Sequence, residues 1–319
     1  MLRTMFTPIL STIIILSSVS MFQCENETEL MMRPGRTLSD NGVPKATKLV
    51  YAEAKNQSAS SVYGDIVSAL EANPNIGIVA EVDHQANAAS VGLDLPPTNV
   101  VLFGNPNLGT PLMQENQQAG LDLPQKILVY DNGSGRTFAA YNDVAYLAER
   151  HGVAGVETLN KIEGALTNLV ENVTGGSAKT TRQKKIALNE GVITVSSNRS
   201  FDETYEQLRA AIEGNSNLKI VAELDHQANA ASEGLTLNPT KLIVFGNPNL
   251  GTPLMQENQT IGIDLPQKML VYEKENGDVL IAYNDPYFLA DRHDIKNSDD
   301  ILNKISNALA NLAATAANN

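Results

Sequence analysis

The pattern of apolar and polar residues along the chain predicts two successive rounds of strands and helices. In the first round, short runs rich in β-branched residues predict strands, which lie at residues 49–54, 76–83, 99–104, 126–132 and 136–142. Apolar residues at helical spacing predict helices, which lie at residues 61–72, 84–90, 110–120 and 156–171. Another short helix is expected to begin at Asp143, a residue type that commonly caps helices.

These elements predict the α+β class of folds. Strands alternate with helices in each round. Each round ends with a β-hairpin and then a helix, so each round is expected to build one sheet. We therefore predict two tandem two-layer domains, each a mixed β-sheet with helices packed on one face.

One stretch of fourteen residues is written twice. The sequence FGNPNLGTPLMQEN occupies residues 103–116 and recurs letter for letter at residues 245–258, 142 positions later. All four histidines keep the same spacing and pair as His84 with His226 and His151 with His293. The chain is therefore a tandem duplication.

The duplication sets the expected domain boundaries. The copies extend over residues 45–172 and 187–314, and a polar, partly basic stretch at 173–186 is expected to be a flexible linker. Each copy has its own strands, helices and apolar runs. We therefore expect either copy to fold alone in a cooperative transition.

The two copies have diverged unevenly. Between Val79 and Asn116, 30 of 38 positions are identical to their partners in the second copy. Between Ser58 and Asn75, only 6 of 18 positions are identical. The first segment has tolerated little change, so it ranks highest as a shared working or packing surface.

The N-terminal residues predict export. Arg3 precedes a largely apolar run at residues 5–22, and an acidic, polar stretch follows it, which is the pattern of a secretory signal. We assign residues 1–24 as a signal peptide or lipoprotein signal; an uncleaved membrane anchor is the alternative. Cys24 is the only cysteine, so no internal disulfide forms, and it is either lipidated or incidental. The expected location is extracytoplasmic, in the periplasm or attached to the cell envelope.

Charge and composition exclude one class of partner. The formal net charge is −13 and aromatic residues make up 5% of the chain, so neither phosphate contacts nor base stacking are favoured. We expect no nucleic-acid partner. A membrane is expected only through the N-terminal lipid or an uncleaved signal, and a small molecule or a metal ion is the expected ligand.

Several repeated motifs together resemble one known family. FGNPNLGTPLMQEN, followed by DLPQKILVY and by AYND…LAERH, is similar to the family named only as domain of unknown function 302. The resemblance covers nearly all of both copies. It implies a compact two-layer α+β fold, and because the family has no established activity it leaves function open.

The glycine-rich segment from Gly104 to Thr110 is the first candidate site. Its spacing imitates a phosphate-binding loop, but the lysine before Thr110 is missing, which argues against a nucleotide. The plainer interpretation is turn geometry, with Thr110 as N-cap and Pro111 opening the helix. The functional alternative is a small anion held by backbone N–H groups beside Asn105.

A polar cluster at the start of the helix 84–90 is the second candidate. Asp83 is expected to cap that helix, with His84 in its first turn and Asn87 on the same face. Local capping explains these residues structurally. A metal site or a proton relay is the functional alternative, and the exact recurrence of the cluster in the second copy favours it.

The third candidate lies near the last strand of each copy. Tyr141 and Asn142 end that strand, and Lys126 enters a neighbouring strand at a position that lysine usually avoids. Arg150 and His151 fall in the last turn of the following helix, where cations complement the helix dipole. Lys126 and Lys268 are expected to be the positive partner of Asp83 or Asp143, or of a bound anion.

We interpret the chain as an exported binding or interaction module with one equivalent site per domain. The alternative is a small-molecule hydrolase or other enzyme using Asp83, His84 and Tyr141; a purely structural duplication is the third interpretation. Cofactor, metal and catalytic residues are unknown from sequence. The candidate ligand-binding residues are Asp83, His84, Asn87, Asn105, Lys126, Tyr141, Asn142, Asp225, His226, Asn229, Asn247, Lys268, Tyr283 and Asn284.

Overall fold

The computed structural model describes residues 42–318, which belong to one compact unit. The expected export signal and Cys24 lie outside the described residues, so their assignment stays a prediction. Among the described residues, no helix combines the length and the hydropathy needed to cross a membrane.

The first copy forms a sheet with the strand order β2-β3-β4-β5-β1-β6. Its strands are β1 (Leu49–Glu53), β2 (Gly77–Asp83), β3 (Thr98–Gly104), β4 (Gln125–Asp131), β5 (Thr137–Asn142) and β6 (Lys179–Thr180). Its helices are α1 (Ala59–Glu71), α2 (His84–Ser90), α3 (Pro106–Glu115), the 3-10 helix η1 (Gln117–Leu121), α4 (Val144–His151) and α5 (Thr158–Thr174).

The second copy repeats this arrangement with the strand order β7-β11-β10-β9-β8. Its strands are β7 (Val192–Ser196), β8 (Lys219–Asp225), β9 (Thr240–Gly246), β10 (Gln267–Glu273) and β11 (Val279–Asn284). Its helices are α6 (Phe201–Glu213), α7 (His226–Ser232), α8 (Pro248–Glu257), the 3-10 helix η2 (Gln259–Ile263), α9 (Pro286–Arg292) and α10 (Asp299–Ala317).

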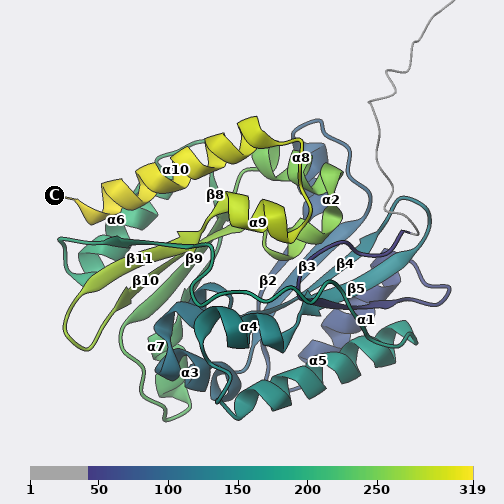
Figure 1. Cartoon of the computed structure of the whole chain (residues 1–319), viewed down its shortest axis with the longest axis horizontal. Coiled ribbons are helices and arrows are strands. Elements are labelled where there is room, and N and C mark those ends of the chain that lie inside the picture. Colours follow the sequence, from purple (N-terminus) through teal and green to yellow (C-terminus); the bar gives the residue numbers. More distant parts are fainter. Residues whose placement is uncertain (1–41, 319) are drawn as a thin grey trace, which may run out of the picture. The chain divides into compact units, whose positions relative to one another are not determined.

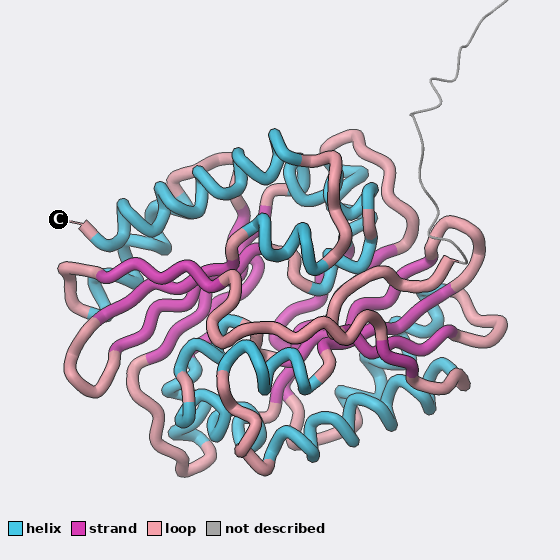
Figure 2. Tube along the Cα trace, viewed as in Figure 1, coloured by secondary structure: helices cyan, strands magenta, loops and turns pink. Residues whose placement is uncertain are grey.

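The predicted α+β class, with helices on one face of each sheet, is confirmed. Figure 1 shows α1 and α5 along the sheet of the first copy, and α6 and α10 along that of the second. The tube in Figure 2 separates the two groups of strands in magenta from the cyan helices that cover them. The expectation of mixed sheets needs one correction, because every strand ladder is antiparallel.

The segment between the copies is ordered where a flexible linker was expected. Within it, β6 pairs with β1, and Ile186 is buried in the core of the first copy. Arg182 Nε donates a hydrogen bond to Thr47 Oγ1 at 2.9 Å. Polar composition alone suggested mobility, but backbone pairing and one apolar anchor hold the segment in place.

The repeated glycine-rich segment is helical earlier than expected. Asn105, and not Thr110, is the N-cap of α3, and its Oδ1 accepts a hydrogen bond from the Asn107 N–H at 2.9 Å. Pro106 takes the first helical position, where a missing N–H costs nothing. Pro111 therefore lies inside the helix, and the expected helix over 110–120 is instead the end of α3 followed by η1.

The copies share a third buried cluster between their sheets. Successive side chains of a strand point to opposite faces, so Val101 faces the helices of its own copy while Val100 faces the other copy. The shared cluster contains residues of both sheets, among them Val100, Leu102, Leu128, Leu242, Val244 and Leu270. Both faces of each sheet are therefore buried, which explains the nearly continuous apolar runs in their central strands.

Exchanged contacts reinforce this shared face. Helix α2 packs on α8 and α7 on α3, while η1 lies on strands of the second copy and η2 on strands of the first. The same elements are therefore used reciprocally, as in a two-fold symmetric dimer.

Candidate functional site

The near-identical segments of the two copies meet in two pockets, each built by both copies. Pocket A is a cavity of ≈ 420 Å³ lined by the start of α3 and the β3 end of the first copy, with His226 and Asn229 from the second. Pocket B, ≈ 120 Å³, is lined by the equivalent segment of the second copy, with His84 and Asn87 from the first. The repeated fourteen residues thus face the repeated HQAN helix of the opposite copy.

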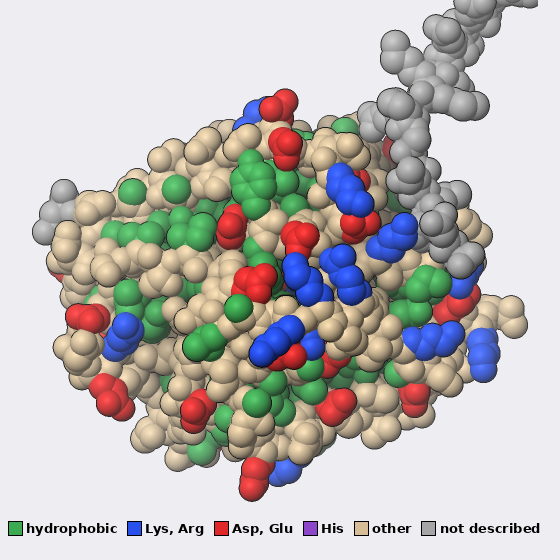
Figure 3. Space-filling model, in the orientation of Figure 1, with side chains coloured by type: hydrophobic (Ala, Val, Ile, Leu, Met, Phe, Trp, Pro, Cys, Tyr) green, Lys and Arg blue, Asp and Glu red, His purple; other side chains and the backbone are tan. Residues whose placement is uncertain are grey.

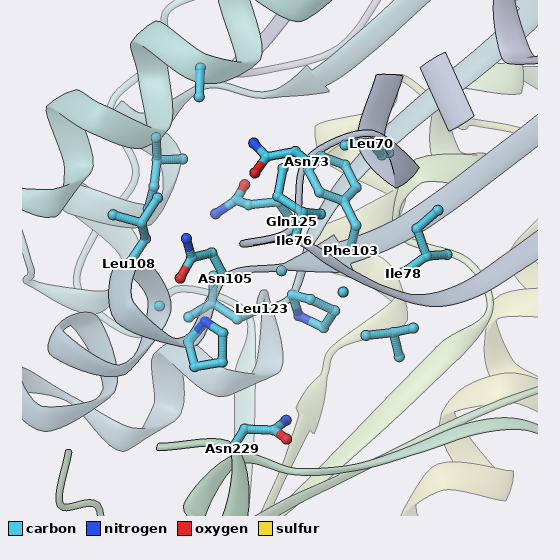
Figure 4. A pocket seen from close by; sticks show the side chains of 18 of the residues that line it. Leu70, Asn73, Ile76, Ile78, Phe103, Asn105, Leu108, Leu123, Gln125 and Asn229 are labelled. Carbon is cyan, nitrogen blue, oxygen red and sulfur yellow. The ribbon is translucent and has the colours of Figure 1, made fainter. Parts of the chain in front are cut away.

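Pocket A is mainly apolar, with amide groups at its sides. Leu70, Ile76 and Phe103 form part of its apolar wall. Figure 4 shows the side-chain amides of Asn105 and Gln125 near each other on one side of the pocket. Among the residues that the structure describes, its lining contains no Asp, Glu, Lys or Arg.

Two polar atoms in the wall of pocket A have no hydrogen-bond partner within residues 42–318. They are Gln125 Nε2 and Thr110 Oγ1. Thr110 is 1% exposed, so water outside the molecule does not satisfy its hydroxyl group. Buried polar groups normally have partners, and two orphans beside one cavity point to a ligand or bound water there.

The two predicted histidines lie at the interface between the copies. His84 Nε2 donates a hydrogen bond to the Gly262 carbonyl at 3.1 Å, and the His226 ring lies against Gly120 in the same way. Burial lowers the pKa of each histidine to about 4, so both are neutral near pH 7. Neither is placed as a metal ligand beside the aspartate that precedes it.

The aspartates and asparagines at helix starts have capping roles. Asp83 and Asp225 each accept a hydrogen bond at 2.8 Å from the backbone of the helix that follows. Asn247 caps α8 as Asn105 caps α3, and both asparagines also line a pocket. Asp83 caps a helix and lines neither pocket. Asn105 both caps a helix and lines pocket A.

The tyrosines lie on the helix-facing side of each sheet. Tyr141 Oη hydrogen-bonds to Thr167 Oγ1 of α5 at 2.7 Å, and Tyr283 is buried in the core of the second copy. Tyr141 therefore does not join Asp83 and His84, and this arrangement gives no support to the hydrolase alternative.

A second group of predicted residues forms a buried charged cluster between the copies. Asp122 Oδ2 accepts hydrogen bonds from Arg150 Nη1 and His151 Nε2, both at 2.7 Å. Burial alone would raise the pKa of Asp122, but the Arg150 charge and the His151 hydrogen bond hold it well below its usual range. Asp264 pairs with Arg292 and His293 in the same way.

The arginines of this cluster reach across to the opposite copy. Arg150 Nη2 donates to Asn284 Oδ1 at 2.8 Å, and Arg292 Nη2 donates to Asn142 Oδ1 at 2.7 Å. The Arg292 guanidinium also lies 3.8 Å from the centre of the Tyr146 ring. The candidates Asn142 and Asn284 therefore hold the copies together.

The lysines Lys126 and Lys268 complete the cluster. Lys126 Nζ lies 3.8 Å from Asp264 Oδ1 of the opposite copy, so its carboxylate partner is neither Asp83 nor Asp143, the two that were expected. Lys268 Nζ donates to the Asp264 carbonyl at 3.0 Å. Burial, followed by the charge of Lys126, lowers the pKa of Lys268 to about 7. Neither lysine lines pocket A or B.

Sequence reasoning missed several residues that the structure brings into these sites. Asp122 and Gln125 belong to the repeated DLPQK stretch, in which Asp and Lys enter the charged cluster while Leu, Pro and Gln line a pocket. Arg150 and His151 were assigned to the helix dipole, yet they are buried at 0% and 1% exposure. The exact repetition of DLPQK in both copies was the signal that could have identified Asp122 and Gln125.

Other binding chemistry has less support among the described residues. No group of three or more His, Cys, Asp or Glu side chains within 42–318 is arranged to hold a metal ion. Figure 3 shows acidic and basic side chains interspersed on the visible face.

Curated relatives match part of the chain. A protein of Brucella suis biovar 1 and one of Brucella abortus biovar 1, each named "Fluoride-specific ion channel FluC 1", are both 42% identical over 114 residues. The match covers 36% of this chain, and 44% and 42% of those proteins respectively. The chain thus spans less than half the length of these relatives.

A solved structure and a family model also match. The structure, an uncharacterized conserved protein DUF302 from Bacillus stearothermophilus, is 22% identical with a TM-score of 0.37, over 40% of this chain and 98% of that one. The family model described as Domain of unknown function DUF302 matches residues 51–172 and 193–312. The chain therefore belongs to the DUF302 family and contains its domain twice.

Proposed function

We propose that the protein binds a small, uncharged and largely apolar molecule in pocket A, with one hydrogen-bonding end held by Gln125 and Thr110. The observation that supports this most is the pair of unpartnered polar atoms in a mainly apolar cavity. Its ≈ 420 Å³ is within the range of small-molecule sites.

Energetics favour an occupant with a polar end. A buried polar group without a partner costs about 1–3 kcal/mol, so a ligand that satisfies both groups recovers part of that cost. Gln125 Nε2 is a donor, and Thr110 Oγ1 donates or accepts. An amide or a hydroxyl group matches this set.

The charge of the wall selects against ions. Pocket A has no acidic or basic lining residue, and His226 stays neutral because burial lowers its pKa to about 4. A charged ligand would lose its hydration without gaining an ion pair. This proposal rests on the pocket and not on the names of the Brucella relatives, because more than half of each relative lies outside the match.

Titration of the full chain with octanamide, followed by calorimetry, tests the proposal. Octanamide supplies an apolar chain and an amide end. We expect Gln125→Leu to weaken binding about two- to tenfold, the worth of one hydrogen bond. The equivalent Gln267→Leu in pocket B is the matched control and should leave the affinity unchanged.

A filled pocket provides the second arm of the test. Ala165 lines pocket A from α5 and is exposed, so Ala165→Trp can occupy the cavity without disturbing the core. We expect this variant to keep the melting temperature and to lose octanamide binding. Undiminished binding by Ala165→Trp would contradict the proposal.

We also propose that the protein acts outside the cytoplasm. The support is the apolar run at residues 5–22 behind Arg3 and before an acidic stretch. Mass spectrometry of the native N-terminus should find a start near residues 20–26; an intact Met1 would contradict export.

A further inference from the structure

The two pockets have corresponding walls but differ by one charged residue. Each is lined by the repeated glycine-rich segment, the Leu-Pro-Gln stretch, the last helix of its copy, and a His and an Asn from the opposite copy. Lys219 lines pocket B, whereas its counterpart in pocket A is Gly77. One pocket therefore has a lysine in its lining where the other has a residue without a side chain.

Strand pairing shows that the two positions are equivalent. Gly77 pairs with Gly104 between β2 and β3, and Lys219 pairs with Gly246 between β8 and β9. A Cβ atom built at Gly77 would meet nothing within 4 Å, so pocket A has room for a side chain there. The difference is thus one of chemistry at a shared backbone position.

Lys219 is available to a ligand. Its side chain is exposed. Within residues 42–318, Lys219 is the only Lys, Arg, Asp or Glu that lines pocket B. Because the chain as a whole has a net charge of −13, an anion gains only from this local positive group.

The two pockets also differ in volume. Pocket B has ≈ 120 Å³ against ≈ 420 Å³ for pocket A. An apolar cavity of about 150 Å³ holds a molecule as small as benzene. Pocket B therefore suits a chain of only a few carbon atoms.

We infer that the pockets have diverged in ligand charge: pocket B binds a short aliphatic monocarboxylate, with its hydrocarbon in the cavity and its carboxylate paired with Lys219. This inference rests on the proposed function, since it assumes that the pockets are ligand sites. Pocket A keeps its larger uncharged ligand, because Gly77 leaves it without a cation.

Calorimetric titration of the full chain with butyrate and with its uncharged counterpart butyramide tests the inference. We expect butyrate to bind about two- to fivefold more tightly, the preference that one exposed ion pair supplies, and to lose this preference at 0.5 M salt. Lys219→Gly should abolish the preference and still bind both compounds weakly. Ala308→Trp, which fills pocket B, should abolish binding of both.

The reciprocal variant gives the converse result. Gly77→Lys should add a second butyrate site, in pocket A, and Ala165→Trp in that background should remove it. Equal binding of butyrate and butyramide by the native protein and by Lys219→Gly would overturn the inference while leaving the octanamide result intact. Failure of octanamide to bind, with a clear butyrate preference that depends on Lys219, would overturn the function proposed for pocket A alone.

Discussion

His84 of the first copy donates a hydrogen bond to the carbonyl of Gly262 in the second, across 3.1 Å. The same element in the second copy places His226 against Gly120. In a two-fold interface the same residue makes equivalent contacts from each copy to the other. A change in one copy therefore breaks the equivalence, and both copies must keep the residue. This reciprocity gives a physical reason why the two histidines and the two glycines are each the same residue in both copies, although only the histidines lie in the near-identical segment.

Adding a methyl group at Gly262 should weaken the interface. Its Cβ would lie 3.1 Å from Leu128 Cδ1 and 3.3 Å from Met255 Sδ, so neighbours in both copies must move. We expect Gly262→Ala to lower the free energy of unfolding by about 1–3 kcal/mol in urea titrations. Gly164→Ala in α5, where a Cβ meets nothing within 4 Å, is the control and should be neutral or stabilising.

Acid should destabilise the protein in the window between pH 6.5 and 4. Burial lowers the pKa of His84, His226 and His293 to about 4, so the unfolded chain binds more protons than the native one in this window. The free energy of unfolding must then fall as pH falls from 6.5 to 4. Urea titrations at several pH values can measure the slope, and His84→Gln, which keeps a donor for Gly262, should reduce it. A free energy of unfolding that rises on acidification would contradict this.

Alkaline conditions should act in the opposite sense through Lys268. Its pKa is lowered to about 7 from 10.5, so between these values the native protein has lost a proton that the unfolded chain retains. The free energy of unfolding should therefore rise between pH 7 and 9, by at most about 1.4 kcal/mol per pH unit. Lys268→Met should remove this rise, and an unchanged slope in that variant would assign the effect to other groups.

Breaking the buried ion pair should be costly. Arg292→Met leaves the carboxylate of Asp264, which is 0% exposed, without its principal cation. We expect a loss of about 3–5 kcal/mol in the free energy of unfolding, and a smaller loss when Asp264→Leu is added. Lys184→Met removes an exposed pair with Asp291 and should cost about 1 kcal/mol or less. Similar losses for both single variants would show that the cluster is not desolvated in solution.

Local patterns were sufficient to predict the elements of each copy. The cap at Asp83 and the strand runs followed from residue types, and the structure confirms them. The start of α3 was misplaced because Thr110-Pro111 also fits a helix start, and only the Asn105 cap with Pro106 behind it decides between the two.

Contacts between the copies could not be predicted from these patterns. His84 and Asn105 lie close in the sequence, but they line different pockets, because α2 packs on the opposite copy. Periodicity indicates that a side chain is buried and does not identify the surface that buries it. The expectation that each copy folds alone stays a prediction, and the shared cluster argues against it, since the face that includes Leu128 would be exposed in an isolated copy.

Hydrogen exchange after a distant destabilising substitution tests most directly whether the copies form one folding unit. Ile212 lies in α6, within the core of the second copy and outside the shared cluster, and it is 0% exposed. Ile212→Ala should lower stability by about 2–5 kcal/mol. If the copies form one folding unit, the opening free energies of β3 and β4 in the first copy should fall by the same amount as those of β9 and β10. Unchanged protection of β3 and β4, with loss confined to β9 and β10, would contradict it.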